Sequence, residues 1–408
     1  MRYDLVFEGG GAKGMVFVGA LQEFEARGHT HARLLGTSAG AITASLLSVG
    51  YSSQEMLSAL QEKKDGQSVF TNFMGTPAPF TAKDLQDNDF LNLLKSINIP
   101  LLPAALEDGL DDHLVDWFAK QPRSRHLFSF VQRGGWYSAD AFIVWLQAKM
   151  DSGTYQGKPR QFSQMTLEEH FAATRKELTV VAADTTGESM LVLNHRTAPQ
   201  CPLVWAVRMS MSIPLLWQEV VWQSGWGPYY GQDISGHTIV DGGLLSCFPL
   251  ELYLSNLKDV TDVMGPKVDD PVLGLLIDET LPVPGTDQPT AKKASIDLEE
   301  FHTVRRISSL IDTAISAHDK MVIDAYEKIV VHLPAKGYGT TEFNMSDLRQ
   351  QLLVSAGRQA MAAYLSQHAP EGPTPSQDEV KRNATAVDRV AGRILDRSVR
   401  KMQVALNV

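Results

Sequence analysis

The sequence predicts an α/β fold whose central sheet is mainly parallel. Within the first 50 residues, two apolar segments of strand length each run through a glycine-containing turn into a segment with helical periodicity. Further apolar runs of strand length occur between residues 178 and 333. Strands that alternate with helices in this way are typical of a parallel sheet covered by helices.

The expected elements follow one another along the chain in a simple order. A strand at 3–7 precedes a helix at 15–27, and a strand at 33–35 precedes a small-residue helix at 41–47. Four later strands are expected at 178–182, 238–240, 272–277 and 329–333. A loop is expected at 282–289 and a long helix at 302–329.

The alternating pattern extends over residues 1–365, which we expect to form one domain. Between 66 and 135 the pattern loosens and several prolines interrupt it, so this segment is interpreted as an insertion over one end of the sheet. The sequence favours a lid and a purely structural excursion equally here. Prolines at 370–375 precede a polar helix expected at 378–406, so residues 366–408 are interpreted as a C-terminal helical extension.

The composition is that of a globular protein. Of the 408 residues, 44% are hydrophobic and 21% are charged, with a formal net charge of −10. This charge gives no general attraction to nucleic acid or to an anionic membrane, so any lipid contact has to be local and apolar. No stretch approaches the roughly 18 apolar residues of a membrane span, and the first residues do not resemble a signal peptide. We therefore expect a cytoplasmic protein, although secretion without a cleaved leader would leave no mark in the sequence.

A glycine cluster lies between the first strand and the first helix, and its members are Gly9, Gly10, Gly11, Ala12, Lys13 and Gly14. The spacing fits a dinucleotide-binding turn, but that turn needs an acidic residue about 20 positions later, and the second strand ends without one. A phosphate loop would need Ser or Thr after Lys13. The favoured interpretation is a turn whose backbone N–H groups hold an oxyanion, with a nucleotide and a structural turn as alternatives.

A second glycine turn follows the strand at 33–35. Ser38 lies between Gly36 and Gly40 in a G-x-S-x-G pattern that joins a strand to a helix, as a nucleophile elbow requires. The glycines permit the sharp reversal that lifts the hydroxyl above the sheet. The pattern alone occurs often by chance, and its position beside the glycine cluster makes it specific.

A serine hydroxyl needs a second group that accepts its proton. The histidines late enough in the chain for a Ser-Asp-His order are His302, His318, His332 and His368, and none lies in a glycine-marked loop. Asp241 is the better candidate, because it ends a β-branched strand and is followed by Gly242 and Gly243. Burial would raise the pKa of this carboxyl toward a value useful for a general base. Taken alone, the same residues would fit an Asp-Gly turn.

Together these motifs strongly resemble the patatin-like phospholipases. The glycine cluster, the elbow around Ser38 and the Asp241 segment occur in the family's order. The segment 208–214 is similar to the family's Ser-rich loop, and 342–365 is similar to its closing helix. The resemblance covers residues 3 to about 365 and is poor for 66–135 and after 370.

The resemblance implies a three-layer α/β/α sandwich and lipid ester hydrolysis by a Ser-Asp dyad. Ser38 is then the nucleophile, Asp241 the base, and the amides of Gly10 and Gly11 the foremost oxyanion donors, while Lys13 steadies the loop. It implies a phospholipid or other lipid ester as substrate and peripheral contact with membranes. This chemistry needs no metal, calcium included, and no cofactor. The alternatives are an effector of the same fold that a small nucleotide or a partner protein activates, and a nucleotide-binding module.

Overall fold

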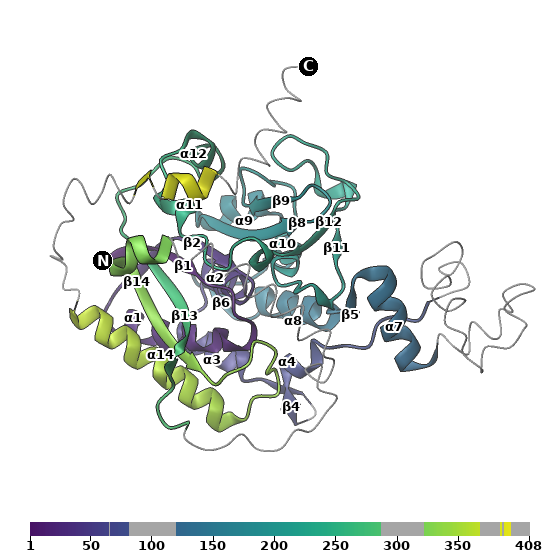
Figure 1. Cartoon of the computed structure of the whole chain (residues 1–408), viewed down its shortest axis with the longest axis horizontal. Helices are drawn as coiled ribbons and strands as arrows, with labels where there is room; N and C mark the ends of the chain where they lie inside the picture. Colours follow the sequence, from purple (N-terminus) through teal and green to yellow (C-terminus); the bar gives the residue numbers. More distant parts are fainter. Residues whose placement is uncertain (65, 81–119, 287–321, 368–383, 386, 393–408) are drawn as a thin grey trace, which may run out of the picture.

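The computed structural model describes residues 1–64, 66–80, 120–286, 322–367, 384–385 and 387–392 (Figure 1). Within them an eight-stranded sheet has the order β11-β12-β8-β2-β1-β13-β14, with β9 paired to β8. Its strands are β1 (Arg2–Phe7), β2 (Thr30–Thr37), β8 (Leu178–Asp184), β9 (Ser189–Leu193), β11 (Val220–Val221), β12 (Thr238–Asp241), β13 (Val272–Pro282) and β14 (Val330–Lys336). Strands β8, β2, β1, β13 and β14 are mutually parallel. Strands β9 and β12 pair antiparallel with β8, and β11 pairs antiparallel with β12. The predicted mainly parallel sheet is therefore confirmed.

Each face of the sheet carries its own hydrophobic core. Successive side chains of a strand point to opposite faces, and accordingly Leu5 and Phe7 of β1 belong to one core while Val6 belongs to the other. Leu34 and Leu35 of β2 are divided in the same way. A sheet buried on both faces requires a layer of helices on each side.

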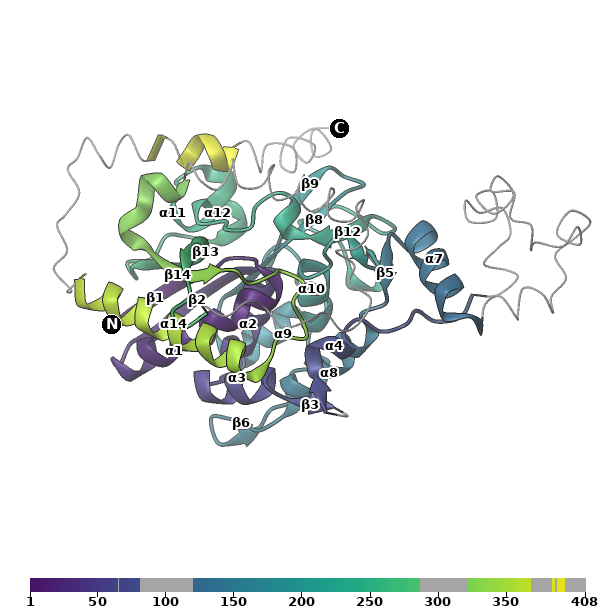
Figure 2. The ribbon, with the colours of Figure 1, turned by 60° about the horizontal axis from the view of Figure 1, so that its bottom comes forward.

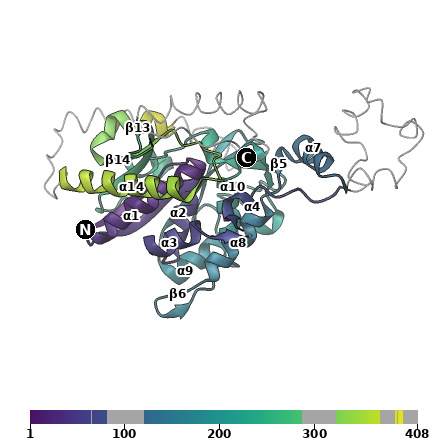
Figure 3. The same ribbon diagram turned by 90° about the horizontal axis from the view of Figure 1, so that it is seen from below.

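The two helix layers are unequal. The larger layer contains α1 (Met15–Ala26), α2 (Ala39–Ser48), α3 (Ser53–Leu60), α8 (Asp140–Asp151), α9 (Leu167–Thr174), α10 (Leu203–Ser210) and α14 (Asp347–Gln367). The smaller layer contains α11 (Glu251–Leu254) and α12 (Lys258–Met264). Figure 2 shows the sheet between them, and Figure 3 shows the larger layer face on. This is the three-layer α/β/α arrangement expected from the resemblance.

Several predicted boundaries differ from the observed ones. The strand expected at 33–35 spans Thr30–Thr37, because the polar Arg33 is buried with its guanidinium bonded to Asp4 of the neighbouring strand. The loop expected at 282–289 starts later, since β13 continues to Pro282 and 287–289 lie outside the described residues. The helix expected at 342–365 begins at Asp347. Of the helix expected at 302–329, only 322–326 is described as α-helix, and a 3-10 turn over Glu327–Ile329 follows it.

Only parts of the expected insertion and tail are described. The stretch before residue 81 forms the short α4 (Val69–Asn72), and the stretch after 119 forms α7 (Pro122–Arg133) and β5 (Gly135–Tyr137), at the edge of the molecule in Figure 1. Strand β5 pairs with β10 (Leu215–Trp217) away from the main sheet. In the tail, Val387 is fully buried in the smaller layer's core. The domain limits and the lid interpretation remain predictions.

Within the described ranges no helix combines the length and the hydrophobicity that crossing a bilayer needs.

Helices α1 and α14 approach each other through glycine. A Cβ atom on Gly19 would lie 1.7 Å from the carbonyl oxygen of Val354, and one on Gly357 would lie 2.1 Å from that of Val16. We expect Gly19→Ala to force the helices apart and to lower the free energy of unfolding by about 1–3 kcal/mol. Denaturant unfolding followed by circular dichroism measures this loss.

The matched control is Gly225→Ala. A Cβ atom there would have no neighbour within 4 Å, so its unfolding midpoint should stay close to that of the wild type. Equal midpoints for both variants would show that the helix contact tolerates the added methyl group.

Candidate active site

Two strands meet end to end along one edge of β8. The other edge of β8 is occupied by β9 over Val180 to Asp184. On the opposite edge of β8, parallel β2 ends with Thr37 beside Val181, and antiparallel β12 ends with Asp241 beside Ala182. Because these two partners on β8 are consecutive residues, the residue after β2 and the last residue of β12 are brought together. Ser38 and Asp241 therefore meet although 203 positions separate their numbers.

Ser38 occupies a strained turn. Its φ of 52° and ψ of −118° are unusual for a residue with a side chain, and it precedes the first helical residue of α2. The flanking glycines leave no room for side chains, since a Cβ on Gly36 would lie 2.3 Å from the backbone of Gly40, and one on Gly40 would lie 2.3 Å from the oxygen of Phe7. The local geometry is that of a nucleophile elbow.

A hydroxyl bridges the gap between the two strand ends. Ser210, the last residue of α10, donates to the carbonyl oxygen of Val181 at 2.6 Å and accepts from the N–H of Ser38 at 2.9 Å. Two residues later, the backbone carbonyl oxygen of Ser212 accepts from the N–H of Asp241 at 2.9 Å. The sequence marked 208–214 as similar to a family loop without giving these serines a role. They fix the backbones of both predicted catalytic residues.

Asp241 is a buried carboxyl group with one unused oxygen. The residue is 4% exposed, and Oδ1 accepts from the N–H of Gly243 at 2.7 Å. Oδ2 forms no hydrogen bond within the described part of the chain. Burial raises the pKa of this carboxyl to about 7, although the nearby Ser38 hydroxyl and the Gly243 amide act to lower it. The two side chains are thus close enough to interact electrostatically, but Oδ2 and the hydroxyl are not in hydrogen-bond geometry.

The glycines after Asp241 are required sterically. A Cβ on Gly242 would lie 2.3 Å from the oxygen of Val181, and one on Gly243 would lie 3.0 Å from both Oδ1 of Asp241 and Sγ of Cys247. The Asp-Gly pair is therefore not a free hairpin turn, because it is packed onto β8.

The amides of the glycine cluster differ in their availability. The N–H of Gly9 donates to Cys247, that of Ala12 to Thr340 and that of Lys13 to Gly10. The prediction that all residues from Gly9 to Gly14 form the oxyanion hole is therefore too broad. No hydrogen bond within the described ranges uses the N–H of Gly10 or Gly11.

Glycines of the cluster also provide close packing. A Cβ on Gly9 would lie 3.2 Å from the Cβ of Ser38, and one on Gly14 would lie 2.8 Å from the Cβ of Ala39. Gly11 has a φ of +56°, and a Cβ there would meet the oxygen of Thr340 at 2.2 Å. The glycine loop is thereby pressed directly against the elbow.

Lys13 is held at the edge of the site. Its side chain is 4% exposed and its Nζ forms an ion pair with Glu279, near the outer end of β13. This contact supports the expectation that Lys13 steadies the loop. Glu279 itself was not anticipated, because nothing local in the sequence links residues 266 positions apart.

A cavity of about 500 Å³ contains the predicted reactive groups. It is lined by Glu8, Gly9, Gly10, Gly11, Lys13, Ser38, Ile213, Pro214, Asp241, Gly243, Leu244, Cys247, Leu276, Ile277, Asp278, Glu279, Thr280, Ile323 and Thr340. The volume and the aliphatic side chains suit an apolar ligand chain. Among the described residues, no group of His, Cys, Asp and Glu side chains could hold a metal ion.

The one candidate histidine base that the structure describes does not line this cavity. His332 lies on β14, where its Nδ1 is 2.8 Å from Oδ2 of Asp278, and it is not among the lining residues. His302, His318 and His368 lie outside the described residues. Of the cysteines, Cys201 is fully buried, whereas Cys247 lines the cavity and was not anticipated.

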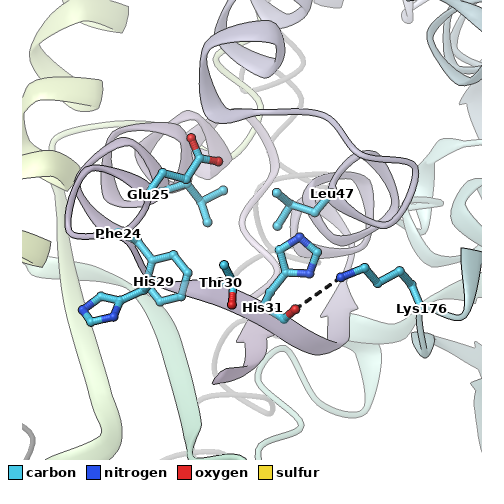
Figure 4. A pocket seen from close by; sticks show the side chains of 8 residues that line it. Phe24, Glu25, His29, Thr30, His31, Leu47 and Lys176 are labelled. Atoms are coloured by element: carbon cyan, nitrogen blue, oxygen red, sulfur yellow. Dashed lines mark hydrogen bonds between the residues drawn. The ribbon is translucent and has the colours of Figure 1, made fainter. Parts of the chain in front are cut away.

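A second cavity of about 260 Å³ lies at the opposite end of β2, beside Thr30 (Figure 4). His31 faces Leu47 there, and its carbonyl oxygen accepts from Nζ of Lys176 at 3.4 Å. Burial, together with the charge of Lys176, lowers the pKa of His31 to about 4, so its ring is neutral near pH 7. None of the described residues that line this cavity is Ser or Cys. The groups suited to acyl transfer are therefore at the Ser38 end of the strand.

Comparison with known proteins identifies relatives of this chain. The model of the family described as patatin-like phospholipase matches residues 5–254. Uncharacterized protein YqhO of Bacillus subtilis (strain 168) is 25% identical over 374 residues, which cover 90% of this chain and 99% of that protein. Probable lipid hydrolase 463L of Invertebrate iridescent virus 6 is 21% identical over 251 residues, covering 61% of this chain and 62% of that protein.

Among solved structures, VipD from Legionella pneumophila aligns with 16% identity and a TM-score of 0.44, over 90% of this chain and 67% of VipD. The family match spans more than half of the 408 residues and includes both strand ends that meet on β8. The chain therefore belongs to the patatin-like phospholipase family.

Proposed function

We propose that this chain is a serine lipid acyl hydrolase that cleaves phospholipid or lysophospholipid esters with Ser38 as nucleophile and Asp241 as base. The family supports lipid hydrolysis in general. The observation that carries the finer proposal is the buried carboxyl of Asp241, whose pKa is raised to about 7 and whose Oδ2 has no hydrogen-bond partner in the described structure. A general base works best when its pKa lies near the working pH.

In the first half of the reaction, Oγ of Ser38 attacks the ester carbonyl carbon while its proton passes to Oδ2 of Asp241. The N–H groups of Gly10 and Gly11, which have no acceptor in the described chain, donate to the oxyanion that forms. The tetrahedral intermediate then collapses. The alcohol half of the lipid leaves with the proton from Asp241, and the acyl group stays esterified to Ser38.

In the second half, Asp241 accepts a proton from a water molecule that attacks the acyl ester. The same amides stabilise the second oxyanion. Collapse releases the fatty acid and returns the proton to Oγ of Ser38, so the enzyme is restored. The Ser38 end of α2 adds the favourable field of a helix N-terminus.

The first test removes each member of the pair. We expect Ser38→Ala and Asp241→Asn to lower fatty-acid release from mixed phospholipids by about 10³-fold or more, because each variant lacks the nucleophile or the proton acceptor. Mass spectrometry of the released fatty acids measures this loss. Ser45→Ala is the control, since this hydroxyl bonds within α2 to Ile42. Unchanged release by either site variant would disprove the dyad.

The second test uses pH. The carboxyl has to be ionised to accept a proton, so kcat/KM should rise with pH through an apparent pKa near 7 and level off above it. A water-soluble ester whose own charge is constant from pH 5 to 9 is the suitable substrate. A rate that stays flat between pH 5 and 8 would exclude a base of this pKa.

The third test uses stability. Burial raises the pKa of Asp241 from 3.8 in the unfolded chain to about 7 in the folded chain. The folded state therefore binds the extra proton between these values, and stability is lost as pH rises through about 7. Asp241→Asn lacks this loss, so its Tm should exceed that of the wild type by a few degrees at pH 8 and by much less at pH 4.5. Calorimetry at both pH values measures the difference, and a higher wild-type Tm at pH 8 would contradict it.

A further inference from the structure

Four charged side chains besides Asp241 line the active-site cavity. They are Glu8, Lys13, Asp278 and Glu279, all of them among the residues that line it. Glu8 follows β1 and accepts from the N–H of Ile277, which places it against β13. The other three come from the glycine loop and from the outer part of β13. In the described lining, one cation thus faces three carboxylates, besides Asp241.

The lone cation is already neutralised. Lys13 is almost fully buried and paired with Glu279, whose side chain is 63% exposed and faces the solvent end of the cavity. A phosphate or carboxylate arriving there would have to displace Glu279 to reach the ammonium group. Lys13 is therefore not a free receptor for an anion.

Asp278 adds a further negative charge beside this pair. Burial acts to raise its pKa, but hydrogen bonds from Thr280 and His332 outweigh it and hold the pKa below its usual value. Its Oδ1 accepts from the N–H of Thr280 at 2.8 Å. The carboxyl of Asp278 is therefore ionised at neutral pH.

Aliphatic residues from other elements also line the cavity. Ile213 and Pro214 come from the loop that follows α10, and Leu244 comes from the segment after Asp241. With the ester carbonyl at Gly10 and Gly11, an acyl chain finds apolar contacts there, and the polar part of the lipid is left to the carboxylates. The carboxylates that line the cavity repel a bound ligand that carries extra negative charge.

We infer that the cavity selects lipid esters whose headgroup carries no net charge, such as phosphocholine or phosphoethanolamine, over esters whose headgroup carries a net negative charge, and that Glu279 is a specificity-determining residue. This inference rests on the proposed lipid hydrolysis. A choline or ethanolamine ammonium offsets the negative phosphate of its own headgroup and is attracted by the net negative charge that Glu8 and Asp278 leave beside the Lys13–Glu279 pair. Phosphatidylglycerol carries the phosphate charge without that compensation.

The experiment compares kcat/KM for phosphatidylcholine and phosphatidylglycerol with identical acyl chains. Each lipid is presented at a low mole fraction in micelles of an uncharged detergent, so that the surface charge stays small. For the wild type we expect kcat/KM for phosphatidylcholine to exceed that for phosphatidylglycerol by about three- to thirty-fold. This is the effect of one unit charge at about 8 Å when the effective dielectric constant lies between that of a protein surface and that of water. High salt should reduce the ratio.

Two variants test the role of Glu279. Glu279→Gln should lower the ratio, and Glu279→Lys should bring it to about one or reverse it. The ratio cancels any common loss of rate from a loosened glycine loop, so a merely structural role would not move it. Glu168→Lys is the matched control, because Glu168 is exposed on α9 and does not line the cavity. This substitution changes the net charge of the protein by the same amount as Glu279→Lys. Its ratio should equal that of the wild type.

The outcomes separate this inference from the proposed function. Equal rates on the two lipids, a preference for phosphatidylglycerol, or a ratio that Glu279→Lys leaves unchanged would overturn the specificity while leaving lipid hydrolysis intact. If the folded wild type releases fatty acid from neither lipid, the proposed function fails and the specificity fails with it.

Discussion

The active-site geometry depends on the shared edge of β8. Strands β2 and β12 approach each other along this edge and stop at consecutive residues of β8. The stop is sharp at both ends, because β2 turns at Ser38 into α2 and β12 turns at Gly242 into a 3-10 turn. Two rigid strands therefore determine the distance between the hydroxyl and the carboxyl, and no flexible loop has to close to bring them together.

This arrangement concentrates unfavourable features in one place. Ser38 has a strained backbone, Asp241 is buried with an unpaired oxygen, and Oγ1 of Thr37 is buried without a hydrogen-bond partner in the described structure. Each of these lowers stability by an amount on the order of 1 kcal/mol or more. A sheet with a hydrophobic core on both faces can tolerate them, since β8 and the C-terminal parts of β1 and β2 are buried.

The sequence predicts those parts of the site that are local in the chain. The strand-turn-helix units around Gly10 and Ser38 are short and periodic, so their elements and glycines can be identified directly. Strands β9 and β11 were not anticipated, because one lies between loops and the other is only two residues long. The availability of individual amides was also beyond the sequence, since the acceptors for Gly9 and Ala12 are carbonyls of residues 247 and 340.

The sequence proposes Asp241 as the partner of Ser38 from its place at a strand end and from the family resemblance, but it does not give the strand pairing that brings the two residues together. Nothing in the residues themselves says that β12 runs antiparallel to β8 on the edge that β2 also uses. In the same way, the Lys13 to Glu279 pair joins segments that local patterns cannot relate. Register and charge pairing arise from the complete fold, so they become visible only in three dimensions.

Burial explains how an aspartate can take the part that histidine plays in many serine hydrolases. An ordinary aspartate is too weak a base at neutral pH, but the raised pKa of about 7 brings Asp241 close to the unperturbed value of an imidazole. That increase depends on the exclusion of water from the carboxyl. In the proposed reaction, an acyl chain bound against the aliphatic side of the cavity would keep the carboxyl dry. The base strength and the preference for a lipid substrate would then have the same physical cause.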